Sequence, residues 1–387
     1  MKNSAKDAPL NVVKKNKKKS KVMLRVFLVF ITILVLLLAV SFLVLTAFKD
    51  KVLNKVNYIP IIENPTMINE EGSVVSISDV IQTEITVIPI PEFEHIHNVL
   101  LIGTDSRGKS YSEDGSGHLA DVIIIMTINE NDNTIKMMSI ARDNYVYIPG
   151  YTDPQKINTA MTYGGPELLM IAIENSLRIE LEEYAYVNFY HMEKIVNAVG
   201  GVYVHVSEEE RTFLEGGLNE LIREQNIKFG SEETRYFVET AGTQLLNGRQ
   251  AVAYSRIRKV GNGDYGRSKR QIEVLQSLLK QFNKLSITKK MDAVETIASQ
   301  VSTNITKDKV EWYAFTFLAN YTSTEFEYLS LPLEGYSNQG MYYDFVYGQW
   351  SIRPDWNGMI PLVQEFIFGE TFPVDPVREI PGAPGVE

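Results

Sequence analysis

An uncharged stretch of 23 residues, Val26–Phe48, constrains this chain of 387 residues more than any other feature. At about 1.5 Å of rise per residue, a helix of that length crosses the ~30 Å apolar core of a bilayer with some tilt to spare. Bulky residues surround Ala39 and Ala47, which disfavours a signal-peptidase site at either alanine. We therefore interpret the stretch as an uncleaved transmembrane helix.

The distribution of charge orients this predicted anchor. Residues 1–25 contain nine Lys and Arg but only one acid, Asp7, a net charge of +8, so the remaining residues must sum to −18 to give the total of −10. By the positive-inside rule the N-terminus stays in the cytoplasm and everything after Lys49 lies outside, which predicts a single-pass protein of the cell membrane. The basic tail is too short for a folded nucleic-acid reader. It is better interpreted as a topology signal that contacts anionic headgroups, so we expect no nucleic-acid partner.

Composition divides the chain into five expected segments. They are a basic cytoplasmic tail (1–25), the transmembrane helix (26–48), a Pro-spotted extracytoplasmic stalk (49–97), a folded domain (98–372) and a Pro/Gly-rich disordered tail (373–387). The folded domain mixes strand-like and helix-like patterns, which predicts an α/β fold with a central mixed β-sheet flanked by helices. The chain has no cysteine, which excludes disulfides and thiolate chemistry.

Hydrophobic periodicity places the elements of the folded domain. Strands are expected at 98–105, 121–129, 134–142, 202–206 and 250–258. A polar turn joins the second and third of these, which predicts a hairpin. Helices are expected at 166–177, 190–199 and 267–285, and the charged residues 207–240 are expected to form an insertion or lid.

Cationic side chains gather near the expected ends of several elements. Arg256 and Arg258 lie two residues apart in a predicted strand and therefore on one face of it, while Arg267 and Gln271 lie one turn apart at the start of the next helix. Guanidinium groups bind phosphate oxygens bidentately, although a single arginine at a strand end is usually a salt-bridge partner. If the fold brings the set together, it predicts a polyphosphate or sulfate ligand. The set is Arg142, Lys156, Arg256, Arg258, Arg267 and Gln271.

Four aspartates lie near these cations in the sequence. Asp105 and Asp121 are expected at loop–strand junctions, where they either bind Mg²⁺ (or Mn²⁺) or cap turns. Asp143 and Asp264 stand beside arginines, and each could orient a guanidinium group or act as a general base. The sequence contains no P-loop, GxSxG, HExxH or paired CxxC motif, and its five histidines show no metal-ligand spacing.

Seven motifs in order make the chain resemble the LytR–CpsA–Psr family of cell-wall glycopolymer ligases over residues 98–285, and more weakly to residue 368. The motifs are NVLLIGTDSR, ADVIIIMTIN, SIARDNYVYIP, KINTAMTYGGPE, VNFYHMEKIVNAVGGV, GTQLLNGRQAVAYSRIRK and GDYGRSKRQ. The resemblance implies a phosphotransferase that moves a glycopolymer, such as a teichoic acid or capsule chain, from a polyprenyl pyrophosphate to peptidoglycan. The bond formed would be a phosphodiester to the 6-hydroxyl of N-acetylmuramic acid.

The same resemblance implies roles for the residues selected above. Asp105 and Asp121 would bind Mg²⁺, and the six anion-binding residues would hold the pyrophosphate. From the positions of the two aspartates beside arginines in the sequence, we expect Arg142, Asp143 and Asp264 to take part in catalysis. The partners would be the lipid-linked glycopolymer, peptidoglycan and the membrane.

Two positions depart from the family pattern. Leu119 stands where many relatives carry an arginine, and Ala141 stands where relatives often carry a proline. The loss of one cation leaves open a non-catalytic role in wall assembly or regulation. A pyrophosphatase is another rival hypothesis, which differs only in that water, and not a sugar hydroxyl, attacks the carrier link. A transcriptional regulator is disfavoured because an acidic external domain offers no DNA-reading surface.

Overall fold

The computed structural model describes residues 46–59, 65–84, 93–104, 118–319, 327–338, 342–344 and 349–384. The chain up to Asn54 and the chain from Lys55 form two separate compact units. The predicted transmembrane helix lies outside the described residues except for its last three positions, 46–48, which are helical. No helix of the described residues is both long enough and apolar enough to span a bilayer.

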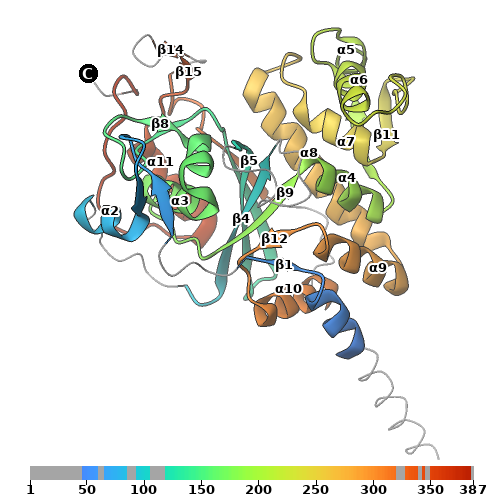
Figure 1. Ribbon diagram of the computed structural model, residues 1–387, viewed down its shortest axis with the longest axis horizontal. Coiled ribbons are helices and arrows are strands. Elements are labelled where there is room, and N and C mark those ends of the chain that lie inside the picture. Colours follow the sequence, from blue (N-terminus) through green and yellow to red (C-terminus); the bar gives the residue numbers. More distant parts are fainter. Residues whose placement is uncertain are drawn as a thin grey trace, which may run out of the picture. The chain divides into compact units, whose positions relative to one another are not determined.

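A mixed seven-stranded sheet forms the centre of the second unit, as predicted (Figure 1). Its order is β1 (Asn57–Tyr58), β12 (Ser302–Thr303), β9 (Glu183–Asn188), β4 (Ile96–Thr104), β5 (Ala120–Asn129), β6 (Thr134–Ile140) and β13 (Glu327–Leu331). The pairs β1–β12, β4–β9 and β6–β13 are parallel, and the other three pairs are antiparallel. The predicted hairpin of residues 121–142 is confirmed as β5–β6.

Helices cover both faces of this sheet, so its strands are apolar on both sides. On one face, Leu100 and Ile102 pack in a cluster with α3 (Ala160–Leu177) and α11 (Trp356–Phe368). On the other face, Val99 packs with α8 (Gly263–Lys284) and α10 (Lys307–Ala319). Alternate residues of β4 thus point to opposite faces, as the two-residue period of a strand requires.

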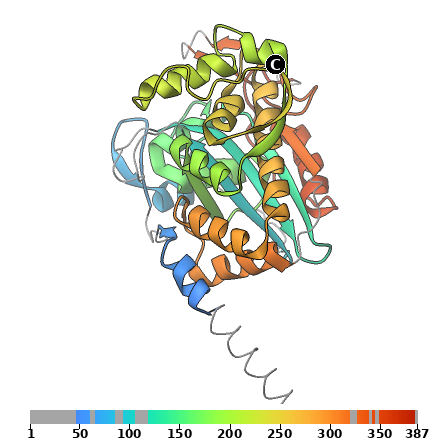
Figure 2. The ribbon, with the colours of Figure 1, turned by 90° about the vertical axis from the view of Figure 1, so that its right-hand side faces the viewer.

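A helical lobe follows β9 and has its own apolar core (Figures 1 and 2). It contains α4 (Phe189–Ala198), β10 (Val202–Val206), α5 (Glu208–Thr212), α6 (Leu218–Lys228), β11 (Gly242–Leu246), α7 (Gly248–Arg256) and α9 (Ile287–Ala298). Helix α8 joins this core through Val274, Leu278 and Phe282. Because α8 also packs on the sheet, it ties the helical lobe to the sheet.

The prediction of a strand at residues 250–258 is wrong, because these residues lie mainly in helix α7. Asn247 and Gln250 form a capping box, in which each side chain accepts the other residue's backbone N–H. Such a box starts a helix. The run that follows, Ala251–Tyr254, is buried throughout, and a short apolar run does not distinguish a buried strand from a buried helix.

The compact fold extends beyond both expected borders of the folded domain. Residues of the predicted stalk form the hairpin β2 (Thr66–Ile68) and β3 (Val74–Ser76) and helix α2 (Ile77–Glu84), and Met67 and Ile77 are buried in the core. In the predicted disordered tail, Val377 exchanges two hydrogen bonds with the Asn357 side chain, at 2.9 and 2.8 Å. These contacts hold the tail against α11, so the prediction of disorder is wrong for the described residues 373–384.

One buried acid makes the stability of this fold depend on pH. Burial raises the pKa of the Glu174 carboxyl to about 7, although the backbone N–H of Leu181, 2.8 Å away, partly opposes this. The unfolded chain releases this proton near pH 4.5 and the folded chain only near pH 7. The contribution of Glu174 to stability therefore falls as the pH rises between these values and is not recovered above them.

Replacing Glu174 with glutamine is expected to raise the free energy of unfolding by about 2 kcal/mol at pH 8 and to change it little at pH 4.5. Glutamine keeps the acceptor for Leu181 but cannot ionise. Urea unfolding at both pH values measures the difference. Glu71→Gln, an exposed site, serves as the control. An identical pH dependence in Glu174→Gln and the parent would contradict the assignment.

Candidate active site

The antiparallel pairing of β5 and β6 brings two predicted site residues together. Ile124 pairs with Ser139, so the start of β5 lies opposite the residues that follow β6. At that end Arg142 donates a hydrogen bond to the Asp121 carboxylate and forms an ion pair with it. Both side chains are partly exposed, at 23% and 20%, so the pair borders the surface.

A short hairpin adds a third charged residue. Strands β7 (Tyr145–Val146) and β8 (Gln155–Lys156) pair in antiparallel register, with Tyr145 opposite Lys156. The Ile157 N–H donates to the Asn144 carbonyl at 2.8 Å. These bonds hold Lys156 beside Asp143, where its Nζ lies 2.9 Å from Oδ1.

The loop between α7 and α8 supplies another cation near Asp143. Arg258 lies in this loop, and its guanidinium is 3.6 Å from Asp143 Oδ2, while Arg142 Nε is 3.5 Å from the same oxygen. Three cations from three segments therefore converge on one buried carboxylate, whose residue is only 4% exposed. We call Arg142, Asp143, Lys156 and Arg258 the Asp143 cluster.

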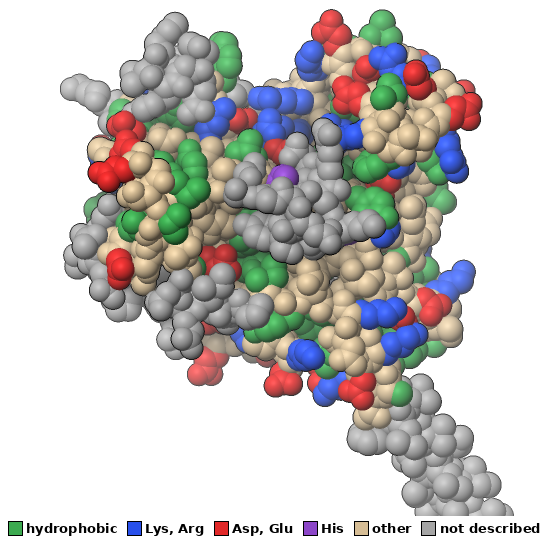
Figure 3. Space-filling view, in the orientation of Figure 1, with side chains coloured by type: hydrophobic (Ala, Val, Ile, Leu, Met, Phe, Trp, Pro, Cys, Tyr) green, Lys and Arg blue, Asp and Glu red, His purple; other side chains and the backbone are tan. Residues whose placement is uncertain are grey.

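The charges of the Asp143 cluster leave an excess of positive charge. Burial by itself would raise the pKa of Asp143, but the hydrogen bond and charge of Lys156 and the charges of Arg142 and Arg258 outweigh it and lower the pKa. With Asp121 included, three cations face two carboxylates. Lys and Arg side chains also gather on this side of the molecule, in the hollow between the sheet and the helical lobe (Figure 3). The arrangement suits an anionic ligand.

A buried arginine next to this loop has a structural role. The Arg270 guanidinium donates to the carbonyls of Ile257 and Val260, at 3.1 and 2.9 Å, and to Glu210 at 2.6 Å. Arg270 thus holds the backbone on both sides of Arg258 in place. The capping box that holds Glu210 indicates the start of a helix but not this distant partner.

Replacing Arg270 with alanine is expected to lower the free energy of unfolding by about 3 kcal/mol, because it leaves the Glu210 carboxylate buried without its partner. The loop with Arg258 should loosen as well, so anion binding should weaken more than tenfold. Thermal unfolding and calorimetry measure the two effects. Arg223→Ala, which breaks an exposed ion pair with Glu220, should change neither quantity.

The other predicted anion-binding residues come from α7 and α8. Arg256 ends α7, with its guanidinium 5.0 Å from the Phe189 ring and 3.8 Å from Glu224. Arg267 and Gln271 are buried near the start of α8, and Gln271 donates to the Ser255 carbonyl at 3.5 Å. A loop, and not a shared strand face, positions Arg258, so the geometric reason given for pairing it with Arg256 is wrong. The roles of these three residues in binding stay a prediction.

The predicted metal pair is described only in part. Asp105 lies outside the described residues, as does the side chain of Asp264. Thr104, which precedes Asp105, pairs with Ala120, which precedes Asp121. Among the described residues no three His, Cys, Asp or Glu side chains form a group able to hold a metal.

Two buried asparagines beside the Asp143 cluster were missed by the sequence analysis. Asn144 and Asn158 are 0% and 3% exposed, and the side-chain oxygen of each accepts no hydrogen bond within the described part of the chain. The Asn158 N–H donates to the Arg142 carbonyl at 3.4 Å. A buried acceptor without a donor next to a cationic site marks a position for a ligand hydroxyl or a water. The signal available in the sequence was their position, since Asn144 directly follows Asp143 and Asn158 lies two residues after Lys156.

Comparison with known proteins gives consistent matches. Residues 67–352 match the LytR_cpsA_psr family. The polyisoprenyl-teichoic acid–peptidoglycan teichoic acid transferase TagU of Enterococcus faecalis is 29% identical over 251 residues, which cover 64% of this chain and 74% of that protein. The crystal structure of B. subtilis TagV is 25% identical with a TM-score of 0.54, covering 73% of this chain and 100% of that one. The structure of TagT bound to LIIa-WTA is 24% identical with a TM-score of 0.53, covers 74% and 97% of the two chains, and shows the same fold.

Proposed function

The chain belongs to the LytR–CpsA–Psr family, and from this premise we propose that it transfers a glycopolymer of teichoic acid or capsule type from a polyprenyl pyrophosphate to peptidoglycan. The observation that carries the proposal is the convergence of Arg142, Lys156 and Arg258 on buried Asp143. A pyrophosphate diester is anionic, and charge-assisted bonds from arginine and lysine are the strongest that a protein offers it. The name of the E. faecalis relative supports the same donor and acceptor.

The proposed reaction is a phosphoryl transfer to a sugar hydroxyl. The 6-hydroxyl oxygen of N-acetylmuramic acid attacks the phosphorus that carries the polymer, the bond from this phosphorus to the bridging oxygen breaks, and polyprenyl phosphate leaves. The hydroxyl proton passes to a base, and a phosphodiester remains. Such a reaction needs positioning and charge neutralisation more than covalent help, and both are what Arg142, Lys156 and Arg258 supply.

Asp143 acts in this proposal as a positioning residue. Its pKa is lowered and three cations surround it, so it stays ionised and is a poor acceptor for the hydroxyl proton. It holds the two guanidinium groups and the ammonium group toward one another against their mutual repulsion. The proposed general base is then Asp264, which lies in the first turn of α8 after the loop of Arg258.

The carboxylates Asp121 and Asp105 would hold Mg²⁺. Oxygen ligands of this kind suit the ion. In the described structure Asp121 is bound to Arg142, so Arg142 would turn from Asp121 toward the phosphate oxygens when the metal is present. When bound, Mg²⁺ would neutralise part of the pyrophosphate charge.

The test is to incubate the purified full-length chain with a lipid-pyrophosphate oligosaccharide, Mg²⁺ and peptidoglycan fragments, and to weigh the products. A fragment heavier by the oligosaccharide phosphate is expected. Free oligosaccharide phosphate in its place would establish a pyrophosphatase, and unchanged donor would favour a non-catalytic role.

Replacing Asp121 with alanine is expected to lower transfer at limiting Mg²⁺ by about a hundredfold, a loss of about 2.7 kcal/mol in transition-state stabilisation. Circular dichroism should show that the fold is kept. Asp79→Ala, at an exposed position of α2, is the matched control. Full activity of the Asp121 variant at limiting Mg²⁺ would make this carboxylate structural.

A further inference from the structure

A second polar surface lies along helix α8, turned away from the face that carries Arg267 and Gln271. Lys269, Lys280 and Lys284 share this face, since they lie 11 and 4 residues apart in sequence, close to whole numbers of turns. Lys269 lies in the second turn of α8, after the loop that carries Arg258, and Lys284 is the last residue of the helix. At about 1.5 Å per residue the three lysines extend for roughly 22 Å.

An open groove separates the far half of this face from strand β10. Its volume is about 260 Å³, close to the lower end of the range of ligand pockets, roughly 300–1,000 Å³. Six of its lining residues could contact a ligand directly. They are Tyr203, His205, Gln276, Lys280, Gln281 and Lys284.

The groove is positively charged although the external chain is acidic. Neither Lys280 nor Lys284 has a carboxylate oxygen within 4.0 Å among the residues that the structure describes. The one acid of the lining, Glu273, accepts a hydrogen bond from the Tyr254 hydroxyl at 2.8 Å. Residues 26–387 carry a net charge of −18 against +8 for the basic tail. Lysines without a carboxylate partner in such a chain are expected to attract an anion.

One wall of the groove is an aromatic ring held in place by the backbone. Tyr203 is 50% exposed, its N–H donates to Ser277 Oγ at 2.7 Å, and the Lys284 ammonium lies 6.0 Å from its ring. An exposed tyrosine ring offers an apolar face with a polar edge, onto which the C–H face of a sugar or polyol can stack. The amide of Gln281 supplies donors and an acceptor for hydroxyl groups.

We propose that this groove binds the repeat units of a glycopolymer that carries phosphate in each repeat, as the polymer leads away from the Asp143 cluster along α8. Lys280 and Lys284 bind the phosphates, and Tyr203 stacks on the sugar or polyol. A neutral glycan would leave the lysines without partners, and a simple polyphosphate would leave the ring uncovered. The inference rests on the proposed function for the identity of the donor and narrows it to an anionic polymer.

The test measures binding of a soluble sugar-phosphodiester oligomer, free of lipid and pyrophosphate, to the full-length chain in neutral nanodiscs. The double variant Lys280→Gln, Lys284→Gln and the variant Tyr203→Ala are each expected to bind about tenfold more weakly at low salt, which corresponds to about 1.4 kcal/mol. The effect of the lysine substitutions on affinity should shrink at 0.5 M salt, because the Debye length is then about a third to a half of its low-salt value. The control, Lys289→Gln with Lys307→Gln, removes the same charge from exposed sites outside the groove and should bind normally.

Three results would overturn the proposal. Equal losses in the control would show a general charge effect. If the groove variants lost binding to a peptidoglycan glycan but still bound the phosphodiester oligomer like the parent, the groove would be a site for the acceptor. Tight binding of inorganic polyphosphate that Tyr203→Ala does not weaken would show that the groove does not recognise a sugar. Because the probe cannot react, a chain that binds it through the groove but transfers nothing would refute the proposed function alone.

Discussion

Replacement of Arg258 by alanine is expected to weaken the binding of a short-chain polyprenyl pyrophosphate by one to two orders of magnitude while the fold is kept. Arg258 reaches Asp143 from a surface loop, and its side chain is 38% exposed, so the core loses little. The expected loss corresponds to one charge-assisted hydrogen bond to phosphate, worth about 1.5–3 kcal/mol. Calorimetry measures the affinity, and circular dichroism verifies the fold.

Lysine at position 258 should restore only part of the affinity, because an ammonium group cannot offer the planar fork of a guanidinium. The neighbouring residue provides a matched control. Lys259 Nζ lies 3.3 Å from Glu215, and its side chain is 61% exposed, so Lys259→Ala should bind like the parent. Should the folded Arg258 variant bind normally while Lys259→Ala does not, the pyrophosphate is on the other side of this loop.

The sequence was sufficient to predict three strands of the sheet, β4, β5 and β6, and the flanking helices α3 and α8. A continuous apolar run in β4 and a polar turn between β5 and β6 identified strands that the structure confirms. The family and the transferase class, inferred from seven motifs, are confirmed by the family match and by the names of the relatives. These features depend on local patterns, which a sequence displays directly.

The site was predicted less well, because its geometry depends on contacts between distant segments. Arg258 was selected for a strand face that does not exist, yet it reaches Asp143 because Arg270 and Glu210 fix its loop. Nothing in the local sequence reveals this contact across 60 residues. Asn158 was missed because an asparagine in a sequence shows neither its burial nor the absence of a donor.

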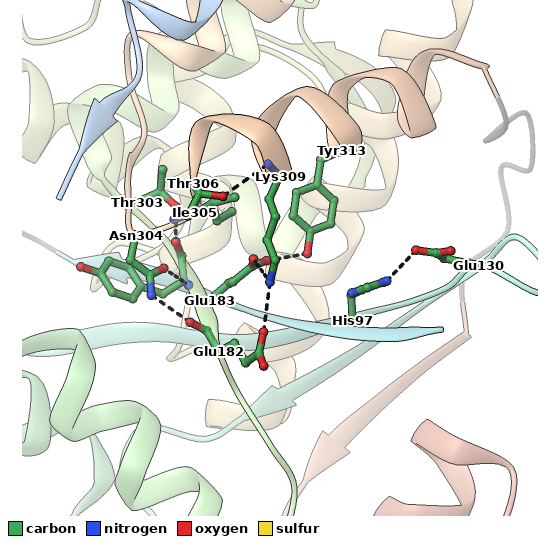
Figure 4. Close-up of polar contacts among 11 residues, drawn as sticks. His97, Glu130, Glu182, Glu183, Thr303, Asn304, Ile305, Thr306, Lys309 and Tyr313 are labelled. Carbon is green, nitrogen blue, oxygen red and sulfur yellow. Dashed lines mark hydrogen bonds and ion pairs between the residues drawn. The ribbon is translucent and has the colours of Figure 1, made fainter. Parts of the chain in front are cut away.

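A second polar network lies at the opposite ends of β4 and β9 from the Asp143 cluster (Figure 4). Glu183 begins β9 and its side chain is 7% exposed. Tyr313 and Lys309 reach it from α10: the Tyr313 hydroxyl donates to Oε2 at 2.5 Å, and the Lys309 ammonium lies 2.8 Å from Oε1. Lys309 also bonds Glu182 at 3.0 Å. The network attaches α10 to the start of β9, the strand that pairs with β12.

The pKa values of its members agree with a mutually stabilising set. Burial by itself would lower the pKa of Lys309, but hydrogen bonds to Glu183 and Glu182 raise it above the ordinary value. Burial, followed by the hydrogen bond to Glu183, raises the pKa of Tyr313. Lys309 therefore stays charged and Tyr313 stays a donor at physiological pH. Both partners of the Glu183 carboxylate are retained over this range.

The combined variant Tyr313→Phe, Lys309→Met is expected to lower the free energy of unfolding by about 3–5 kcal/mol, because it leaves a buried carboxylate with neither partner. Lys309→Met alone should cost only about 1–2 kcal/mol, since the lysine side chain is 45% exposed and water screens its charge. Urea unfolding of the full-length chain measures the losses, and Lys307→Met, an exposed position on the same helix, should be neutral. Adding Glu183→Gln to the combined variant should recover at least half of the loss, because it removes the buried charge. If it recovers nothing, the instability comes from the packing of Tyr313 against the sheet and not from the carboxylate.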